Sequence, residues 1–176
     1  MKFEEHRDNW DALGRLDPLW AIVTDDTKKG GGWDLDAFWE TGRGSGGWVA
    51  RHMSANGLDV ARGRALDFGC GIGRLTQPMC KYFKEVIGVD VAKSMIEAAE
   101  EGNTHRESCR YVHNPSQDLQ CFPSSHFDFV LSLIVLQHMP TQYSKNYIRE
   151  FLRVLRPGGY TFFQLPSAAK DGVAPL

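Results

Sequence analysis

From Arg64 onward, short apolar runs alternate with longer stretches of helical periodicity, and this alternation constrains the fold more than any other feature. The apolar runs have the length of strands, and they span residues 65–68, 86–89, 110–113, 129–133 and 160–165. Helical periodicity spans residues 74–83, 93–101 and 141–155, and Thr141 is expected to cap the last of these helices. Because repeated strand–helix–strand units form parallel sheets with helices on both faces, the pattern predicts an α/β fold, a three-layer doubly wound parallel sheet.

The composition indicates one globular domain with a sizeable core, since 42% of the 176 residues are hydrophobic and 24% are charged. A net charge of -2 provides no field that would attract nucleic acid or an anionic membrane, so the expected partner is a small molecule. No apolar run approaches the roughly 20 residues of a membrane span, and we expect a cytoplasmic protein. The cysteines lack C-x-x-C pairs and nearby histidines, so we expect reduced thiols and no metal site at Cys70, Cys80, Cys109 and Cys121.

The first 60 residues are predicted to be mainly helical. Large apolar residues at helical spacing predict a short helix that Pro18 closes. Asp34 is expected to cap a second helix that stops at Gly42, and Ser45 a third helix that ends at Gly57.

Two further expectations concern the connecting segments and the domain organisation. Residues 28–32 carry three glycines and no periodicity, so they are expected to form a mobile loop, with a plain connector as the simplest role. We expect residues 1–60 to form an N-terminal helical cap and residues 61–176 to form the core of a single domain. Within that core, Pro157 and Gly158 fit the central positions of a type II turn before the fifth strand.

A glycine-rich loop follows the first predicted strand. Gly69, Gly71 and Gly73 stand at alternate positions immediately before a predicted helix. Glycine allows sharp turns and close approach of a ligand, and the N-terminus of the helix offers unpaired N–H groups that favour an anion. Such a loop alone is weak evidence, because nucleotide, flavin and dinucleotide proteins all have one.

Two acidic residues beside this loop make its ligand more specific. Asp67 precedes the first glycine by two residues, where it would repel a pyrophosphate but could accept a hydrogen bond from an ammonium group. The G-x-G-x-G spacing also differs from the G-x-G-x-x-G of dinucleotide sites. Asp90 ends the second strand, where a carboxylate can accept both hydroxyls of a ribose. An amino acid joined to a nucleoside fits this pair, although both residues could simply cap helices at strand ends.

Residues 65–74, Ala-Leu-Asp-Phe-Gly-Cys-Gly-Ile-Gly-Arg, resemble the first motif of the class I S-adenosylmethionine-dependent methyltransferases, which share a Rossmann-like fold. Residues 89–95 resemble the second motif of this family, residues 127–130 the start of its fourth strand, and residues 155–159 the turn before its fifth strand. The resemblance covers roughly residues 64–166. It implies methyl transfer from S-adenosyl-L-methionine to a small-molecule acceptor, at oxygen, nitrogen or carbon.

The resemblance also implies which residues hold the cofactor. Gly69 and Gly71 would approach its methionine part, Asp67 its amino group and Asp90 its ribose. Further cofactor contacts are expected at Cys70, Gly73, Arg74, Val91, Met95, Asn114 and Leu133. Two positions depart from the pattern of the family. Asn114 lacks the usual acidic side chain, so it either contacts the cofactor or serves as a turn residue instead. Ala92 replaces a frequent helix-capping serine, a loss of about 1 kcal/mol.

The catalytic requirements are modest, because the cofactor carries an activated methyl group and alignment alone supplies much of the rate. A hydroxyl or amine acceptor could still require a base. His138 is the candidate, since it follows the fourth strand, although it could equally order the loop before Thr141. The remaining histidines are expected to be surface or packing residues: His6, His52, His105, His113 and His126. The aromatic residues of the cap either sort acceptors or pack in the core: Trp10, Trp20, Trp33, Phe38 and Trp39.

The end of the chain carries one more expectation. The family has seven strands, this chain supplies five, and residues 166–176 contain no strand signal. An apolar edge at residues 160–165 would be left exposed, so we expect a C-terminally truncated chain, a fragment of a longer one, or a partner or second copy on that edge. Two alternative functions stay open: a non-catalytic cofactor-binding or scaffold module, and a nicotinamide-dependent dehydrogenase, which Asp67 and the glycine spacing oppose.

Overall fold

The computed structural model describes residues 1–58 and 60–166, and within them all five strands form one parallel sheet in the order β3-β2-β1-β4-β5. The first part of the chain is helical, with α1 (Phe3–Leu16), α2 (Pro18–Ile22), the short 3-10 helix η1 (Asp26–Lys28) and α3 (Leu35–Ala55). The alternating part follows with β1 (Arg64–Phe68), α4 (Thr76–Met79), β2 (Glu85–Asp90), α5 (Lys93–Glu101), β3 (Cys109–His113), β4 (Phe127–Ser132), η2 (Leu136–His138), α6 (Thr141–Val154) and β5 (Leu155–Phe163).

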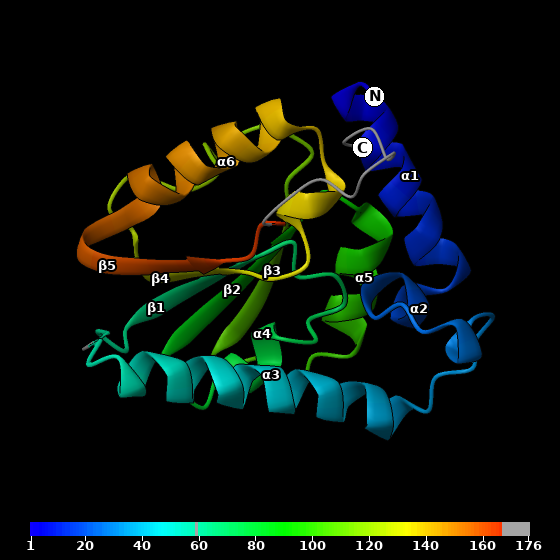
Figure 1. The fold of residues 1–176 in the computed structure, drawn as a ribbon, viewed down its shortest axis with the longest axis horizontal. Coiled ribbons are helices and arrows are strands. Elements are labelled where there is room, and N and C mark those ends of the chain that lie inside the picture. Colours follow the sequence, from blue (N-terminus) through cyan, green and yellow to red (C-terminus); the bar gives the residue numbers. More distant parts are fainter. Residues whose placement is uncertain (59, 167–176) are drawn as a thin grey trace.

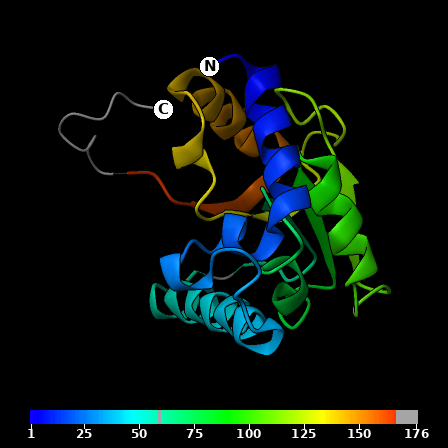
Figure 2. The ribbon, with the colours of Figure 1, turned by 90° about the vertical axis from the view of Figure 1, so that its right-hand side faces the viewer.

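Helices cover both faces of the sheet, so the predicted doubly wound α/β fold is confirmed (Figure 1). Helix α6 covers one face, where Phe151 packs with Leu66 and Val130 of the strands. Helices α3 and α4 cover the other face, where Val49 and Met79 pack against the sheet. Helix α1 lies between α5 on one side and η2 and α6 on the other (Figure 2). This position brings α1 and α2 over the carboxyl ends of the strands.

The region between Asp34 and residue 57 forms one long helix rather than the two that we predicted. Asp34 caps it as expected, because its carboxylate accepts a hydrogen bond from the N–H of Ala37 at 2.9 Å. Ser45 lies inside the helix, and its hydroxyl donates to the Thr41 carbonyl at 2.8 Å. Gly42 does not end the helix, since it allows close packing: a Cβ there would collide with the backbone carbonyl of Arg74.

Three other predicted boundaries also differ from the structure. Helix α4 is much shorter than residues 74–83, because Pro78 has no N–H to donate and the chain continues in tighter turns such as Tyr82 N–H to Met79 carbonyl, 2.8 Å. Thr141 is the first residue of α6 and does not cap it. Strand β5 begins already at Leu155 and includes the predicted turn, where Gly158 has the positive φ, 80°, that a type II turn requires.

Residues 28–32, which we expected to be a mobile loop, are tied to the start of α2. The Asp17 carboxylate accepts the N–H groups of Gly30 and Gly31 at 2.8 and 2.9 Å, and it also accepts the Trp20 N–H at 3.2 Å. The ammonium group of Lys29 lies 5.1 Å from the centre of the Trp20 ring, within the range of a cation–π contact. Backbone hydrogen bonds to a distant carboxylate, which no local pattern announces, therefore hold this segment.

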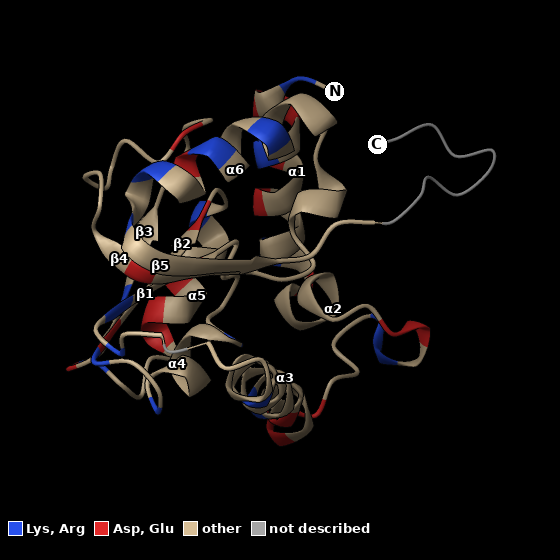
Figure 3. Cartoon of the chain, turned by 60° about the vertical axis from the view of Figure 1, so that its left-hand side comes forward, with Lys and Arg blue, Asp and Glu red and all other residues tan. Residues whose placement is uncertain are grey.

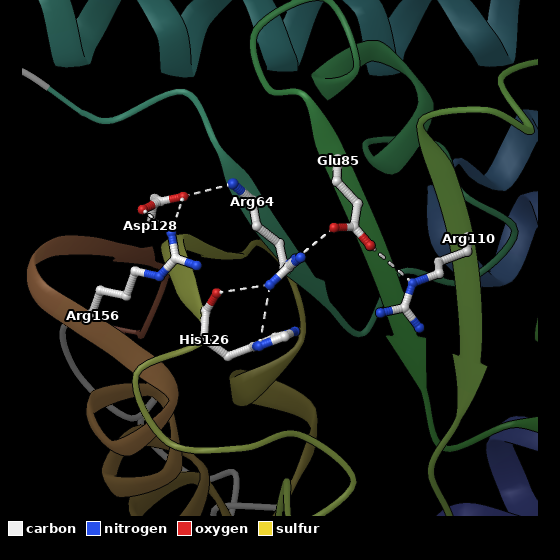
Figure 4. Close-up of polar contacts among 6 residues, drawn as sticks. All are labelled: Arg64, Glu85, Arg110, His126, Asp128 and Arg156. Carbon is white, nitrogen blue, oxygen red and sulfur yellow. Dashed lines mark hydrogen bonds and ion pairs between the residues drawn. The ribbon is translucent and has the colours of Figure 1, made fainter.

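Charged groups at the amino ends of the strands join the sheet from edge to edge (Figure 4). Glu85 of β2 pairs with Arg64 of β1 at 2.5 Å and with Arg110 of β3 at 3.1 Å. On the other side, Asp128 of β4 accepts the backbone N–H of Arg64 at 2.6 Å and pairs with Arg156 of β5 at 3.0 Å. We call these five residues the charge ladder. The charge ladder lies at the amino ends of the strands, opposite their carboxyl ends. It links each strand to the next in the order β3-β2-β1-β4-β5.

Within residues 1–58 and 60–166, no helix has both the length and the apolar character that crossing a bilayer requires. The prediction that residues 166–176 contain no strand falls on a segment of which all but Pro166 lies outside the described residues.

The outer edge of β5 leads to the first testable prediction. In the described part of the chain β5 pairs with β4 alone, while Phe162 on β5 packs edge-on against Trp48 of α3, which is 49% exposed. Because open backbone groups beside apolar side chains template further pairing, we expect the protein to self-associate as its concentration rises. Light scattering against concentration measures this. Leu165→Lys adds a charge beside the edge at a 47% exposed position and should weaken the association; a monodisperse monomer at every concentration would contradict the prediction.

Candidate functional site

The glycine loop after β1 adopts backbone conformations that residues other than glycine rarely adopt. Gly69, Gly71 and Gly73 all have positive φ, at 72°, 54° and 88°. A Cβ at Gly71 would lie 2.6 Å from Cδ1 of Ile22, and one at Gly69 would collide with Val135. Each glycine is therefore required twice, by its own conformation and by the close approach of a neighbouring segment.

Strand β2 holds this loop in place. The N–H groups of Gly69 and Cys70 donate to the Val89 carbonyl at 2.8 and 3.1 Å. The two oxygens of the Asp90 carboxylate accept the Gly71 N–H and the Ala92 N–H, both at 2.9 Å. Desolvation raises the pKa of Asp90 in spite of these hydrogen bonds. Each carboxylate oxygen still has a second lone pair, so Asp90 can accept hydrogen bonds from a ligand while it holds the loop.

Asp67 is a second carboxylate at the same place, and it is almost fully buried. Its Oδ2 accepts a hydrogen bond from the Thr76 hydroxyl at 2.7 Å. Loss of solvent is the largest influence and raises the pKa of Asp67 to about 6, against the opposing effects of Thr76 and the Arg74 charge. A buried carboxylate with a raised pKa is incompletely compensated, so a cationic group of a ligand would be stabilised here.

Arg74 supplies a buried positive charge next to Asp67. It is 6% exposed, and its Nη1 makes two long contacts, at 3.4 Å to the Thr41 hydroxyl and at 3.5 Å to the Ser45 hydroxyl of α3. Its Nε has no hydrogen-bond partner among the described residues. Because buried N–H groups are nearly always paired, the unpaired Nε leaves the guanidinium of Arg74, a residue that lines the cavity, incompletely satisfied.

Helix α5 has its N-terminus completed by α1. Ala92, which replaces a capping serine, makes no side-chain cap. Instead, Asp11 of α1 accepts the Ser94 N–H at 2.8 Å, and the Ser94 hydroxyl donates to the Asp11 carbonyl at 2.8 Å. The sequence predicted that α5 lacks a local cap, and Asp11 of α1 supplies the cap instead. These hydrogen bonds also fix α1 against the segment that follows Asp90.

These groups surround a cavity at the carboxyl ends of β1, β2 and β4. Every residue predicted to contact the cofactor lines this cavity except Gly73, which packs against Tyr111 instead: Asp67, Gly69, Cys70, Gly71, Arg74, Asp90, Val91, Met95, Asn114 and Leu133. Asn114 also has the turn role that we left open, since its amide donates to the Asp118 carbonyl at 2.6 Å and its Oδ1 accepts the Ser116 N–H at 3.3 Å.

The N-terminal helices contribute cavity residues that sequence reasoning missed. Phe3, His6, Ala21 and Ile22 all line the cavity, beside Trp10, which the sequence analysis had named as a residue that could sort acceptors. The prediction that His6 is an ordinary surface or packing residue was incomplete, because His6 is 4% exposed and faces this cavity. Helical periodicity identified α1, but nothing local in the sequence indicated that its inner face closes a site formed by residues far along the chain, from Asp67 onward.

His138 and most aromatic residues of the cap lie outside the cavity lining. The His138 ring packs edge-on against Trp10, with ring centres 5.5 Å apart, and burial lowers its pKa. The indole N–H groups of Trp20 and Trp33 donate to backbone carbonyls at 3.1 and 3.0 Å, so these rings serve packing. Of the cap aromatics that we singled out, Trp10 alone lines the cavity.

Comparison with known proteins now assigns the family. Residues 66–163, more than half of the chain, match the family of the methyltransferase domain. The chain belongs to the class I S-adenosylmethionine-dependent methyltransferases. The matched segment of this methyltransferase runs from β1 into β5, so it contains the glycine loop, Asp67 and Asp90.

Relatives of this methyltransferase act on different acceptors. It is 32% identical over 106 residues to a ubiquinone biosynthesis O-methyltransferase of Xanthomonas oryzae pv. oryzae, covering 60% of this chain and 44% of that one. It is 31% identical over 103 residues to phosphoethanolamine N-methyltransferase 3 of Arabidopsis thaliana, covering 56% and 20%. The methyltransferase therefore spans less than half the length of these curated relatives. Its fold is similar to that of magnesium protoporphyrin IX methyltransferase from Synechocystis PCC 6803, with a TM-score of 0.61, 21% identity, and 88% and 73% coverage.

Proposed function

We propose that this protein transfers the methyl group of S-adenosyl-L-methionine to a small-molecule acceptor bound beneath α1. One observation carries the proposal: a buried carboxylate, a half-buried carboxylate, a buried guanidinium and the glycine loop converge on one cavity at the carboxyl ends of the strands. In open α/β sheets this edge is where ligands bind.

The charges of the cavity match the groups of the cofactor. Asp67 would hold the ammonium group and the guanidinium of Arg74 would attract the carboxylate, so each of these buried charges would gain a further partner. The remaining lone pairs of Asp90 would accept the ribose hydroxyls. Val91, Met95, Asn114 and Leu133 would surround the nucleoside, and Gly69, Cys70 and Gly71 the methionine chain. Gly73 would act indirectly, by letting the loop pack on Tyr111.

The bound cofactor supplies an activated methyl group, and the protein mainly has to align an acceptor with it. Helix α1 lies where it would cover such an acceptor, and its hydrogen bonds through Asp11 fix it there. Residues 1–60 would therefore act only in part as a cap over the core formed by residues 61–176, since α3 of this segment packs against the sheet instead. His138, which packs against Trp10, would help to order the loop before α6.

Calorimetry tests the proposal. We expect saturable binding of S-adenosylmethionine and S-adenosylhomocysteine, and no binding of NAD, because Asp67 would repel a pyrophosphate. Binding of S-adenosylhomocysteine without methyl release towards any acceptor would identify a scaffold module instead. Failure of both cofactor forms to bind would refute the proposal.

The raised pKa of Asp67 predicts a pH dependence of cofactor binding. With its pKa at about 6, Asp67 is mostly ionised near neutral pH and mostly protonated at about pH 5. Because only the ionised form attracts an ammonium group, the affinity for S-adenosylhomocysteine should fall roughly tenfold over these two pH units. Calorimetry over this range measures the fall. Asp67→Asn, which keeps an acceptor for Thr76, should bind weakly at every pH; an equal pH dependence in this variant would assign the titration to another group.

A further inference from the structure

His6 is a buried polar side chain that the proposed cofactor contacts do not use. It lies on the inner face of α1, is 4% exposed and lines the same cavity as Asp90. Burial, and secondly the nearby His138, lower the pKa of His6, and no hydrogen bond contributes to the shift. The imidazole is therefore neutral near neutral pH, and one ring nitrogen keeps a lone pair that can accept a proton.

Apolar side chains line the cavity that His6 enters. They include Phe3 and Trp10 of α1, Ile134 after β4 and Met139 after η2, and the Trp10 ring centre lies 6.2 Å from that of His6. Tyr147 lines it too, but its hydroxyl is occupied, since it donates to the Ser116 carbonyl at 2.7 Å. Ile134 has a positive φ of 61°, which is unusual for a β-branched residue and occurs mostly where function requires it.

The cavity has no cation available for a phosphate group. Across residues 1–58 and 60–166, the ionised side chains that line it are Asp67, Asp90 and Arg74, all at the proposed cofactor end. The charge of Arg74 already acts on Asp67. Helix α2, which closes the cavity through Ala21 and Ile22, carries no charged residue (Figure 3). An anionic acceptor would lose its hydration here without gaining a partner.

We propose that the methyl acceptor is an uncharged, largely apolar molecule with a hydroxyl group, and that His6 contacts this hydroxyl and receives its proton. This inference rests on the proposed function and assigns its substrate class. As the acceptor oxygen bonds to the methyl carbon, the carbon–sulfur bond breaks and its electron pair stays on sulfur. The hydroxyl proton passes to the free ring nitrogen of His6 and from there to water, so charge and atoms balance.

The test follows the imidazole carbon-bound proton signal of His6 by NMR while a probe is added, with and without saturating S-adenosylhomocysteine. The probes are 4-butylcatechol, butylbenzene as its hydroxyl-free analogue, and phosphoethanolamine as an anionic alternative. We expect 4-butylcatechol to shift the His6 signal saturably and to bind roughly five- to tenfold more tightly than butylbenzene, the strength of one hydrogen bond. Phosphoethanolamine should leave the signal unchanged.

Two variants separate contact from packing. His6→Phe keeps a ring of similar size, so both aromatic probes should still bind, but the preference for 4-butylcatechol should disappear. His105→Ala, at an exposed histidine away from the cavity, should keep that preference. Binding of phosphoethanolamine, or an unchanged preference in folded His6→Phe, would overturn the inference. Because the probe titrations are also made without S-adenosylhomocysteine, they report on the acceptor site even if the cofactor proposal fails.

Discussion

Replacing Asp90 by alanine is expected to weaken the binding of S-adenosylhomocysteine by more than tenfold. A charge-assisted contact to the ribose hydroxyls is worth about 1.5–3 kcal/mol, which corresponds to roughly tenfold or more in affinity. The substitution also removes the acceptor for the N–H groups of Gly71 and Ala92, so the glycine loop loses its tie to β2. Both effects act in the same direction, and calorimetry measures their sum.

The matched control for this variant is Glu97→Ala, on the exposed face of α5, the helix that follows Asp90. Glu97 pairs with Lys93 at 3.4 Å, and both side chains are 66% exposed, so its loss should leave the dissociation constant unchanged. Asp90→Asn, which keeps one acceptor oxygen, should bind with intermediate affinity. A folded Asp90→Ala variant with the dissociation constant of the parent protein would exclude Asp90 from the cofactor site.

Removal of the Asp128 carboxylate should lower the free energy of unfolding by about 2–3 kcal/mol. Asp128 is 6% exposed and accepts the Arg64 N–H at 2.6 Å, which links β4 to β1 near the middle of the sheet. Asp128→Ala leaves this backbone N–H without an acceptor in a partly buried place and also removes the partner of Arg156. Urea unfolding measures this loss as a lower midpoint concentration, provided that the slope of the unfolding free energy against urea stays unchanged.

Arg156→Ala is the comparison that separates the two contacts of Asp128. The Arg156 side chain is 45% exposed, so its ion pair is largely screened and its removal should cost at most about 1 kcal/mol. If the two variants lose equal stability, the ion pair rather than the hydrogen bond to Arg64 carries the effect. A loss below about 0.5 kcal/mol in Asp128→Ala would show that the charge ladder contributes nothing to the stability of the sheet.

The strands and the two carboxylates beside the glycine loop could be predicted from local sequence, because their signals lie within a few residues. The apolar run before Gly69 and its alternate glycines predicted the turn that the structure shows, and Asp67 and Asp90 stand where the ends of parallel strands bring them together. The ends of the helices were harder to predict. Gly42 was predicted to end a helix, since glycine is a poor helix former, but here contact with the backbone of Arg74 outweighs its local preference.

The sequence by itself therefore determined the sheet, the glycine loop and the two carboxylates beside it. The tertiary structure alone decided which residues complete the cavity around them. The docking of α1 depends on hydrogen bonds between Asp11 and Ser94, which are 83 residues apart, and it turns His6 into a cavity residue while it places His138 behind Trp10. Such contacts follow from the shape and polarity of two surfaces that meet only after folding, and no periodicity along the chain encodes them.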